Sequence, residues 1–125
     1  MEGEASVARR RSVLSLPRRE PRVFVLDQPR GGNYDVSDAG RFGRITRIEQ
    51  PGDGAFYNDV ALAMVKRAMR DFNRDDYIVA GIGHPLSLFW VAAIAARRTG
   101  GNLKLLYWSR RNNEYSAFNI NVYDS

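Results

Sequence analysis

The stretch Tyr77-Ile78-Val79-Ala80-Gly81-Ile82-Gly83-His84-Pro85-Leu86-Ser87 decides the fold of this chain. Its first part, Tyr77 to Ile82, is a nearly continuous apolar run, which is typical of a strand buried on both faces of a sheet. Gly83 indicates a turn, and Pro85 suits the first turn of a helix. The residues from Leu86 to Ala96 are apolar nearly all round, which indicates a helix that is deeply packed or lies at an interface. The stretch therefore predicts a buried strand that passes through a tight turn directly into a helix.

Further elements are predicted on both sides of this stretch. Apolar residues at helical spacing predict a helix from Phe56 to Phe72. Short apolar or alternating runs predict strands at 23–26, 44–49, 103–108 and 115–123, and a long loop from 28 to 43. Successive strand–helix–strand units favour right-handed crossovers and a parallel sheet. We therefore expect an α/β fold: a small, mostly parallel sheet of about five strands, two helices and an antiparallel C-terminal hairpin at its edge.

Composition limits the possible function classes. The 125 residues contain no cysteine and one histidine, His84. Disulfides, thiolate metal sites, cysteine nucleophiles and multi-histidine metal sites are therefore excluded. We expect no metal and no cofactor. The missing thiols also fit an intracellular, cytoplasmic protein.

The N-terminal residues form a basic arm in this interpretation. Residues 1–21 contain few apolar side chains, so ordering them has little energetic reward, and we expect them to be flexible. Residues 22–125 then form a single α/β domain. The arm could bind nucleic acid or an acidic protein surface through its arginines. These are Arg9, Arg10, Arg11, Arg18 and Arg19.

A second candidate site lies at the turn between the buried strand and its helix. Ligands of open parallel sheets bind beyond the carboxyl ends of the strands, and the N-terminus of a helix attracts anions. Alternatively, Gly83 makes a tight turn and His84 caps the helix. The residues of a possible anion site at this edge are Asp27, Gly81, Gly83, His84, Ser87 and Arg110. Four aromatic residues of the hairpin form either a stacking platform or cross-strand packing pairs: Tyr107, Trp108, Tyr115 and Tyr123.

Membrane insertion is not expected. No apolar segment follows the N-terminal charges, so a signal peptide is not indicated. The uncharged run from Tyr77 to Ala96 is long enough to span a bilayer, but Gly81, Gly83 and Pro85 interrupt it. A strand, a turn and a helix explain this run better than a membrane span does.

The part from Asp76 to Tyr123 resembles small uncharacterised proteins of tailed phages. The similar features are Asp76-Tyr77-Ile78-Val79-Ala80-Gly81, a proline that opens an alanine-rich helix, Gly100-Gly101-Asn102-Leu103-Lys104-Leu105-Leu106, and an aromatic residue before a short basic turn. Those proteins often carry an acidic residue before the proline, where this chain has His84. The resemblance implies a phage accessory protein that acts on a host or virion partner, and it implies no known activity.

Two functions follow as expectations. The first is a non-enzymatic interaction protein that engages nucleic acid or an acidic protein surface through the arginines of the arm. The second is a small anion- or nucleotide-binding domain that uses the segment from Gly81 to Ser87. An enzyme built on the same edge is a third alternative, but no serine lies in a Gly-x-Ser-x-Gly elbow and no paired carboxylates support it. The sequence names neither a partner nor an oligomeric state.

Overall fold

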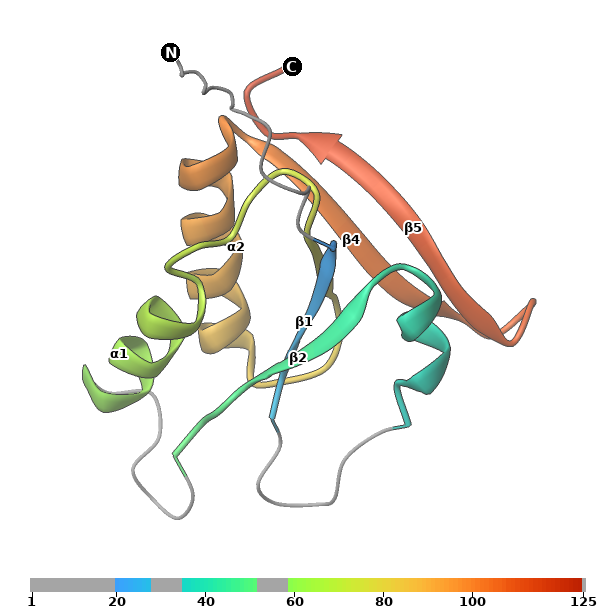
Figure 1. The fold of residues 1–125 in the computed structure, drawn as a ribbon, viewed down its shortest axis with the longest axis horizontal. Helices are drawn as coiled ribbons and strands as arrows, with labels where there is room; N and C mark the ends of the chain where they lie inside the picture. Colours follow the sequence, from blue (N-terminus) through green and yellow to red (C-terminus); the bar gives the residue numbers. More distant parts are fainter. Residues whose placement is uncertain (1–19, 28–34, 52–58, 125) are drawn as a thin grey trace, which may run out of the picture.

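The computed structural model describes residues 20–27, 35–51 and 59–124. Within these ranges the chain forms one sheet, two α-helices and one short 3₁₀-helix (Figure 1). In chain order the elements are β1 (Arg22–Leu26), η1 (Ser37–Arg41), β2 (Arg44–Ile48), α1 (Asp59–Ala68), β3 (Tyr77–Val79), α2 (Pro85–Thr99), β4 (Asn102–Ser109) and β5 (Glu114–Asn121).

The strands lie in the order β2-β1-β3-β4-β5. The first four are parallel, and β5 pairs antiparallel with β4 as a hairpin at the edge. This confirms the α/β fold that the sequence predicts. Strand β1 lies inside the sheet, with β2 on one side of it and β3, β4 and β5 in turn on the other side.

One face of the sheet packs against both α-helices. Phe24 and Leu26 point from β1 toward the helices, where the Phe24 ring lies 5.3 Å from the ring of Phe72. Val65 of α1 and Val91 of α2 close this part of the core. The alternation along β1 sends its other side chains to the opposite face, so this strand is buried on both sides, as expected for a central parallel strand.

The opposite face of the sheet is covered by η1 and the residues next to it. Val23 and Val25 of β1 pack here with Val36 and Ala39, all of them buried. The 3₁₀-helix contacts both β2 and β5, which are the two edge strands. The predicted long loop therefore contains a short helix that covers the second face. The remainder of that loop, residues 28–34, lies outside the described residues.

Helix α2 buries one stripe and exposes the other. Val91 and Ala95 are buried, whereas Leu88 and Ala92 are partly buried. Phe89 is 69% exposed. Of the two alternatives for this helix, deep packing on all sides does not hold within the described residues, because only two helices share this face of the sheet and the outer side of α2 has no described layer above it.

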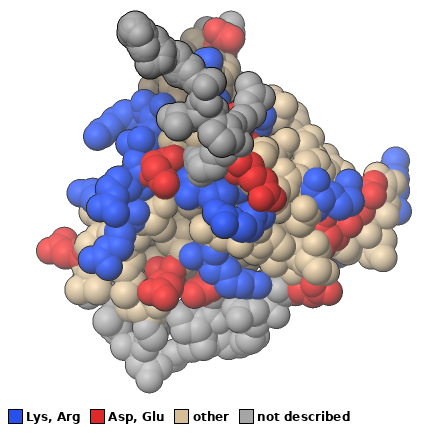
Figure 2. Space-filling model, viewed as in Figure 1, with Lys and Arg blue, Asp and Glu red and all other residues tan. Residues whose placement is uncertain are grey.

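Charged side chains of both signs are mixed on the surface shown in Figure 2. In the part of the chain that the structure describes, no helix is both long enough and apolar enough to cross a membrane. Residues 1–19, which contain the five arginines of the predicted arm, are not among the described residues.

Candidate functional site

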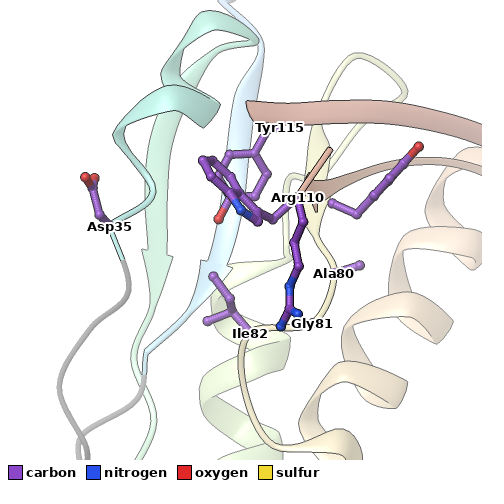
Figure 3. A pocket seen from close by; sticks show the side chains of 8 residues that line it. Asp35, Ala80, Gly81, Ile82, Arg110 and Tyr115 are labelled. Atoms are coloured by element: carbon purple, nitrogen blue, oxygen red, sulfur yellow. The ribbon is translucent and has the colours of Figure 1, made fainter. Parts of the chain in front are cut away.

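The carboxyl end of β3 leaves a hollow in the sheet. The sequence predicts a strand to Ile82, but β3 ends at Val79 and the last ladder bond runs from Ala80 N to Leu106 O at 2.8 Å. The neighbouring β4 continues to Ser109. The space next to the end of β4 has a volume of about 600 Å³. Its lining residues are Asp35, Ala80, Gly81, Ile82, Tyr107, Trp108, Arg110 and Tyr115 (Figure 3).

The hollow lies beside the position where the direction of chain winding changes. From β1 the chain first moves to β2 on one side, whereas β3 and all later strands lie on the other side. In open parallel sheets, ligands bind at the carboxyl ends of the strands next to such a switch point. The topology therefore puts the hollow in the region where this kind of sheet usually binds ligands.

The two glycines of the turn have different roles. A Cβ atom on Gly83 would lie 2.6 Å from Leu26 Cδ1, so Gly83 lets the turn pack closely on β1. A Cβ atom on Gly81 would have no neighbour within 4 Å, and only its φ of +92° favours glycine. Gly81 therefore leaves open space at the floor of the hollow, while Gly83 holds the turn in place.

Opposite charges line the hollow. The side chain of Arg110 extends toward Gly81 and Ile82, and Asp35 lies on the other side (Figure 3). The Ser37 N–H donates to Asp35 Oδ1 at 2.9 Å, and the bonds from Ser37 lower the pKa of this carboxyl. The Asp35 carboxylate is therefore charged at neutral pH, and the hollow offers a cation and an anion to a ligand.

Aromatic rings form the wall on the side of the hairpin. The rings of Trp108 and Tyr115 meet edge to face with their centroids 5.2 Å apart. Trp108 and Tyr107 are both partly exposed, whereas Tyr115 is buried. Burial raises the pKa of Tyr115, and the charges of Asp35 and Asp38 raise it further. The phenol of Tyr115 therefore stays neutral beside the charged carboxylates.

Two side chains of η1 hold Tyr115 in position. The Tyr115 N–H donates to Asp38 Oδ2 at 2.8 Å, and Arg41 Nη2 donates to the Tyr115 carbonyl at 2.7 Å. Arg41 also bonds Asp38 through Nε at 3.0 Å. The hydrogen bonds from Arg41 and from the Tyr115 N–H lower the pKa of Asp38. The two contacts with the Tyr115 backbone, one from Asp38 and one from Arg41, join η1 to the edge of β5. We call these two contacts the η1 clamp.

The structure brings only part of the predicted anion site together. Gly81 and Arg110 both line the hollow. The Leu86 N–H donates to Nδ1 of His84 at 3.2 Å, so His84 is the N-cap of α2, as the alternative interpretation predicts. Because Pro85 has no N–H, this cap also uses the first free donor of the helix.

The other predicted residues face other parts of the fold. Ser87 is buried, and its hydroxyl donates to Gln50 Oε1 at 2.6 Å. Asp27 follows the end of β1, with its Oδ1 atom 4.0 Å from Arg47 Nη1. Neither residue lines the hollow. The hollow does include Asp35, which is not among the predicted residues of the anion site and lies in the predicted loop from 28 to 43.

The part of the chain that the structure describes contains no cluster of side chains suited to bind a metal ion. Within residues 20–27, 35–51 and 59–124, no three histidine or acidic side chains form a group that could hold an ion.

The comparisons with known proteins identify the family. Residues 21–122 match the family model described as phage Pam3 gp32-like protein, which extends the resemblance to phage proteins well beyond the part from Asp76 to Tyr123. The comparison with curated proteins gives no match, and the comparison with solved structures gives none either. The chain belongs to the phage Pam3 gp32-like protein family.

Proposed function

We propose that this phage protein is a binding domain for a small anionic ligand with an aromatic ring, of the mononucleotide class, and that the ligand occupies the hollow at the end of β3. One observation carries the proposal. The hollow combines an arginine, a turn with open space at Gly81 and a wall of aromatic rings, beside the switch point of a mostly parallel sheet.

Arg110 is the reason to expect an anionic group on the ligand. A guanidinium offers several N–H donors in a planar arrangement that fits phosphate oxygens. Within the described residues, no ion pair or hydrogen bond occupies the Arg110 guanidinium, and its side chain extends along Gly81 (Figure 3). A phosphate at the floor of the hollow would therefore meet a charge that no described carboxylate neutralises.

The aromatic wall on the hairpin is the reason to expect an aromatic ring on the ligand. A base that stacks on an aromatic side chain gains about 1–3 kcal/mol by alanine substitution. Trp108 is 43% exposed, so its ring keeps an accessible surface next to the hollow. The carboxylate of Asp35 can accept hydrogen bonds from the ring N–H groups or the sugar hydroxyls of a nucleotide. Inorganic phosphate and a purely apolar ring offer no such donors.

Fluorescence titration tests the proposal. Trp108 lines the hollow, and the other tryptophan is Trp90 on α2. In a Trp90→Phe background, nucleoside monophosphates should change the emission of Trp108 with a saturable isotherm. Inorganic phosphate and the free nucleoside should each bind more weakly, because each uses only one part of the site.

Two arginines of the same turn supply a matched control. Arg110→Ala should weaken nucleotide binding by roughly tenfold or more, since a charge-assisted bond contributes about 1.5–3 kcal/mol. Arg111→Ala removes the same charge from the next position, which does not line the hollow, and should leave affinity nearly unchanged. Equal loss in both variants would indicate general attraction of anions, and no saturable change in Trp108 emission would overturn the proposal.

The other expected function concerns residues outside the described structure. An interaction with nucleic acid or with an acidic protein surface through Arg9, Arg10, Arg11, Arg18 and Arg19 remains a prediction, and it is compatible with a ligand in the hollow.

A further inference from the structure

The two edge strands of the sheet differ in their protection. Edge strands expose backbone donors and acceptors, and proteins usually block such edges with charged residues or proline. The β2 edge follows this rule, because Arg44 and Arg47 are exposed and Pro51 follows the strand closely. The β5 edge is less protected, since Glu114 at its first position is its only charged residue and the rest of the strand, Tyr115 to Asn121, contains neither a charge nor a proline.

The hydrogen-bond pattern fixes which groups of β5 point outward. Leu106 O accepts from Ala80, so Leu106 faces β3 and its antiparallel partner Ala117 faces away from β4. By the same alternation, Tyr115, Asn119 and Asn121 also direct their backbone groups outward. This agrees with the η1 clamp, which binds both the N–H and the carbonyl of Tyr115.

Both ends of the outward edge are blocked. The η1 clamp covers Tyr115 at one end, and at the other end Asn121 O accepts from the Asp124 N–H at 3.3 Å. Tyr115 and Asn121 each lie three residues from Phe118. The accessible part of the edge, residues 116–120, is therefore centred on Phe118.

A second copy of this chain fits that short edge. We propose that two copies pair antiparallel through β5, with the twofold axis at Phe118. In this register Ala117 of one copy opposes Asn119 of the other, so each outward N–H meets an outward carbonyl. The two Phe118 side chains lie opposite each other as a pair without hydrogen bonds, which brings their Cα atoms to about 4.5 Å.

The side chains and charges also favour a second copy. Phe118 is 55% exposed on the helix side of the sheet and, unlike Ile120 of the same strand, is not part of the core under the helices. A facing Phe118 would bury both rings. Although the chain carries a net charge of +5, the accessible edge has no charge of its own, so the pairing puts no like charges opposite each other. The flank of the molecule over β5 is a continuous uncharged area in Figure 2.

Molar mass in solution tests the pairing. The full chain should show twice its 14.2 kDa in light scattering coupled to gel filtration, with dissociation on dilution. Phe118→Lys should shift the mass to that of one chain. The matched control is Phe89→Lys, because Phe89 is also a phenylalanine and is even more exposed, but lies on α2. It should remain a dimer.

The other outcomes contradict the proposal. A single-chain mass at every concentration overturns it, and so does a Phe118→Lys variant that remains a dimer. If only Phe89→Lys dissociates the dimer, the exposed side of α2 is the interface instead of β5.

A cross-linking experiment decides the matter if Phe118→Lys fails to fold. The chain has no cysteine, so a single introduced thiol is a clean probe. A Cα separation of about 4.5 Å lies within the range of a disulfide. Mild oxidation should link Phe118→Cys into a covalent dimer and leave Phe89→Cys monomeric. Equal cross-linking of the two variants, or none in either, would overturn the proposed register.

Discussion

The backbone N–H and the guanidinium of Arg22 both donate to the carboxylate of Asp76, at 2.9 and 3.2 Å. The two residues begin β1 and precede β3, and the Asp76 side chain is fully buried. Asp76 also accepts from the Asn73 N–H at 3.0 Å. One carboxylate thus fixes the start of two neighbouring strands and the turn between α1 and β3.

Removing this carboxylate should destabilise the fold strongly. Asp76→Ala leaves Arg22 charged and nearly buried without its main partner, and breaking a buried pair in this way costs about 3–5 kcal/mol. Asp71 is the matched control, because it bonds the same guanidinium at 3.1 Å but its side chain is 69% exposed. Asp71→Ala should cost less than about 1 kcal/mol. Urea denaturation of both variants measures the difference, and similar losses would contradict the assigned role of Asp76.

The two glycines of the β3–α2 turn should respond differently to alanine. Gly81→Ala introduces only an unfavourable backbone conformation, which costs about 1–3 kcal/mol. Gly83→Ala adds a Cβ atom that overlaps Leu26 at 2.6 Å, on top of a φ of +112°. Its free energy of unfolding should fall further than that of Gly81→Ala. If the order is reversed, the close packing of Gly83 on β1 is not what holds the turn.

The η1 clamp should make stability depend on acid pH. Arg41 and the Tyr115 N–H lower the pKa of Asp38 in the folded state, so the unfolded chain binds the proton more readily. This contribution is present above the unfolded pKa and is lost as the pH falls through the folded pKa. Asp38→Asn should therefore be less stable than the parent at neutral pH, and the gap should close in acid. Thermal unfolding from neutral to acid pH measures this gap, and a constant gap would contradict the prediction.

The sequence predicts the fold well because its signals are local. The apolar run at Tyr77, the turn glycines and the proline at 85 determine the strand, turn and helix without any long-range information. The predicted strand nevertheless extends too far, to Ile82. Apolar composition alone does not show that Gly81 adopts a positive φ, which ends β3 at Val79.

The candidate site is predicted less completely, because distant segments build it. Gly81 and Arg110 follow the carboxyl ends of neighbouring strands, so topology alone places them together. Asp35 reaches the hollow only because η1 crosses the second face of the sheet and bonds β5 near Tyr115. Neither the spacing nor the type of these residues signals that contact. Likewise, no local signal in the sequence shows that Asp76 is buried by its contact with Arg22.

The arginines near the N-terminus carry the last prediction. Arg9, Arg10, Arg11, Arg18 and Arg19 should give the full chain a sequence-independent attraction to nucleic acid, with a dissociation constant of about 10⁻⁴–10⁻⁶ M at physiological salt. Each phosphate engaged on duplex DNA should contribute a slope of about −0.9 to the log–log dependence of affinity on salt. Fluorescence anisotropy with a labelled duplex, repeated over a series of salt concentrations, measures both quantities.

Two variants separate a charge effect from a geometric one. Deleting residues 1–19 should abolish this binding and leave the circular dichroism spectrum of the folded part in place. Replacing the five arginines with lysines should preserve much of it, because the attraction depends mainly on charge. If the truncated chain binds DNA as well as the full chain does, the folded part carries the contact. If the full chain binds no nucleic acid at any salt concentration, an acidic protein surface becomes the expected partner. The lysine variant should then lose affinity for that surface, since lysine cannot reproduce the bidentate contacts of arginine with carboxylates.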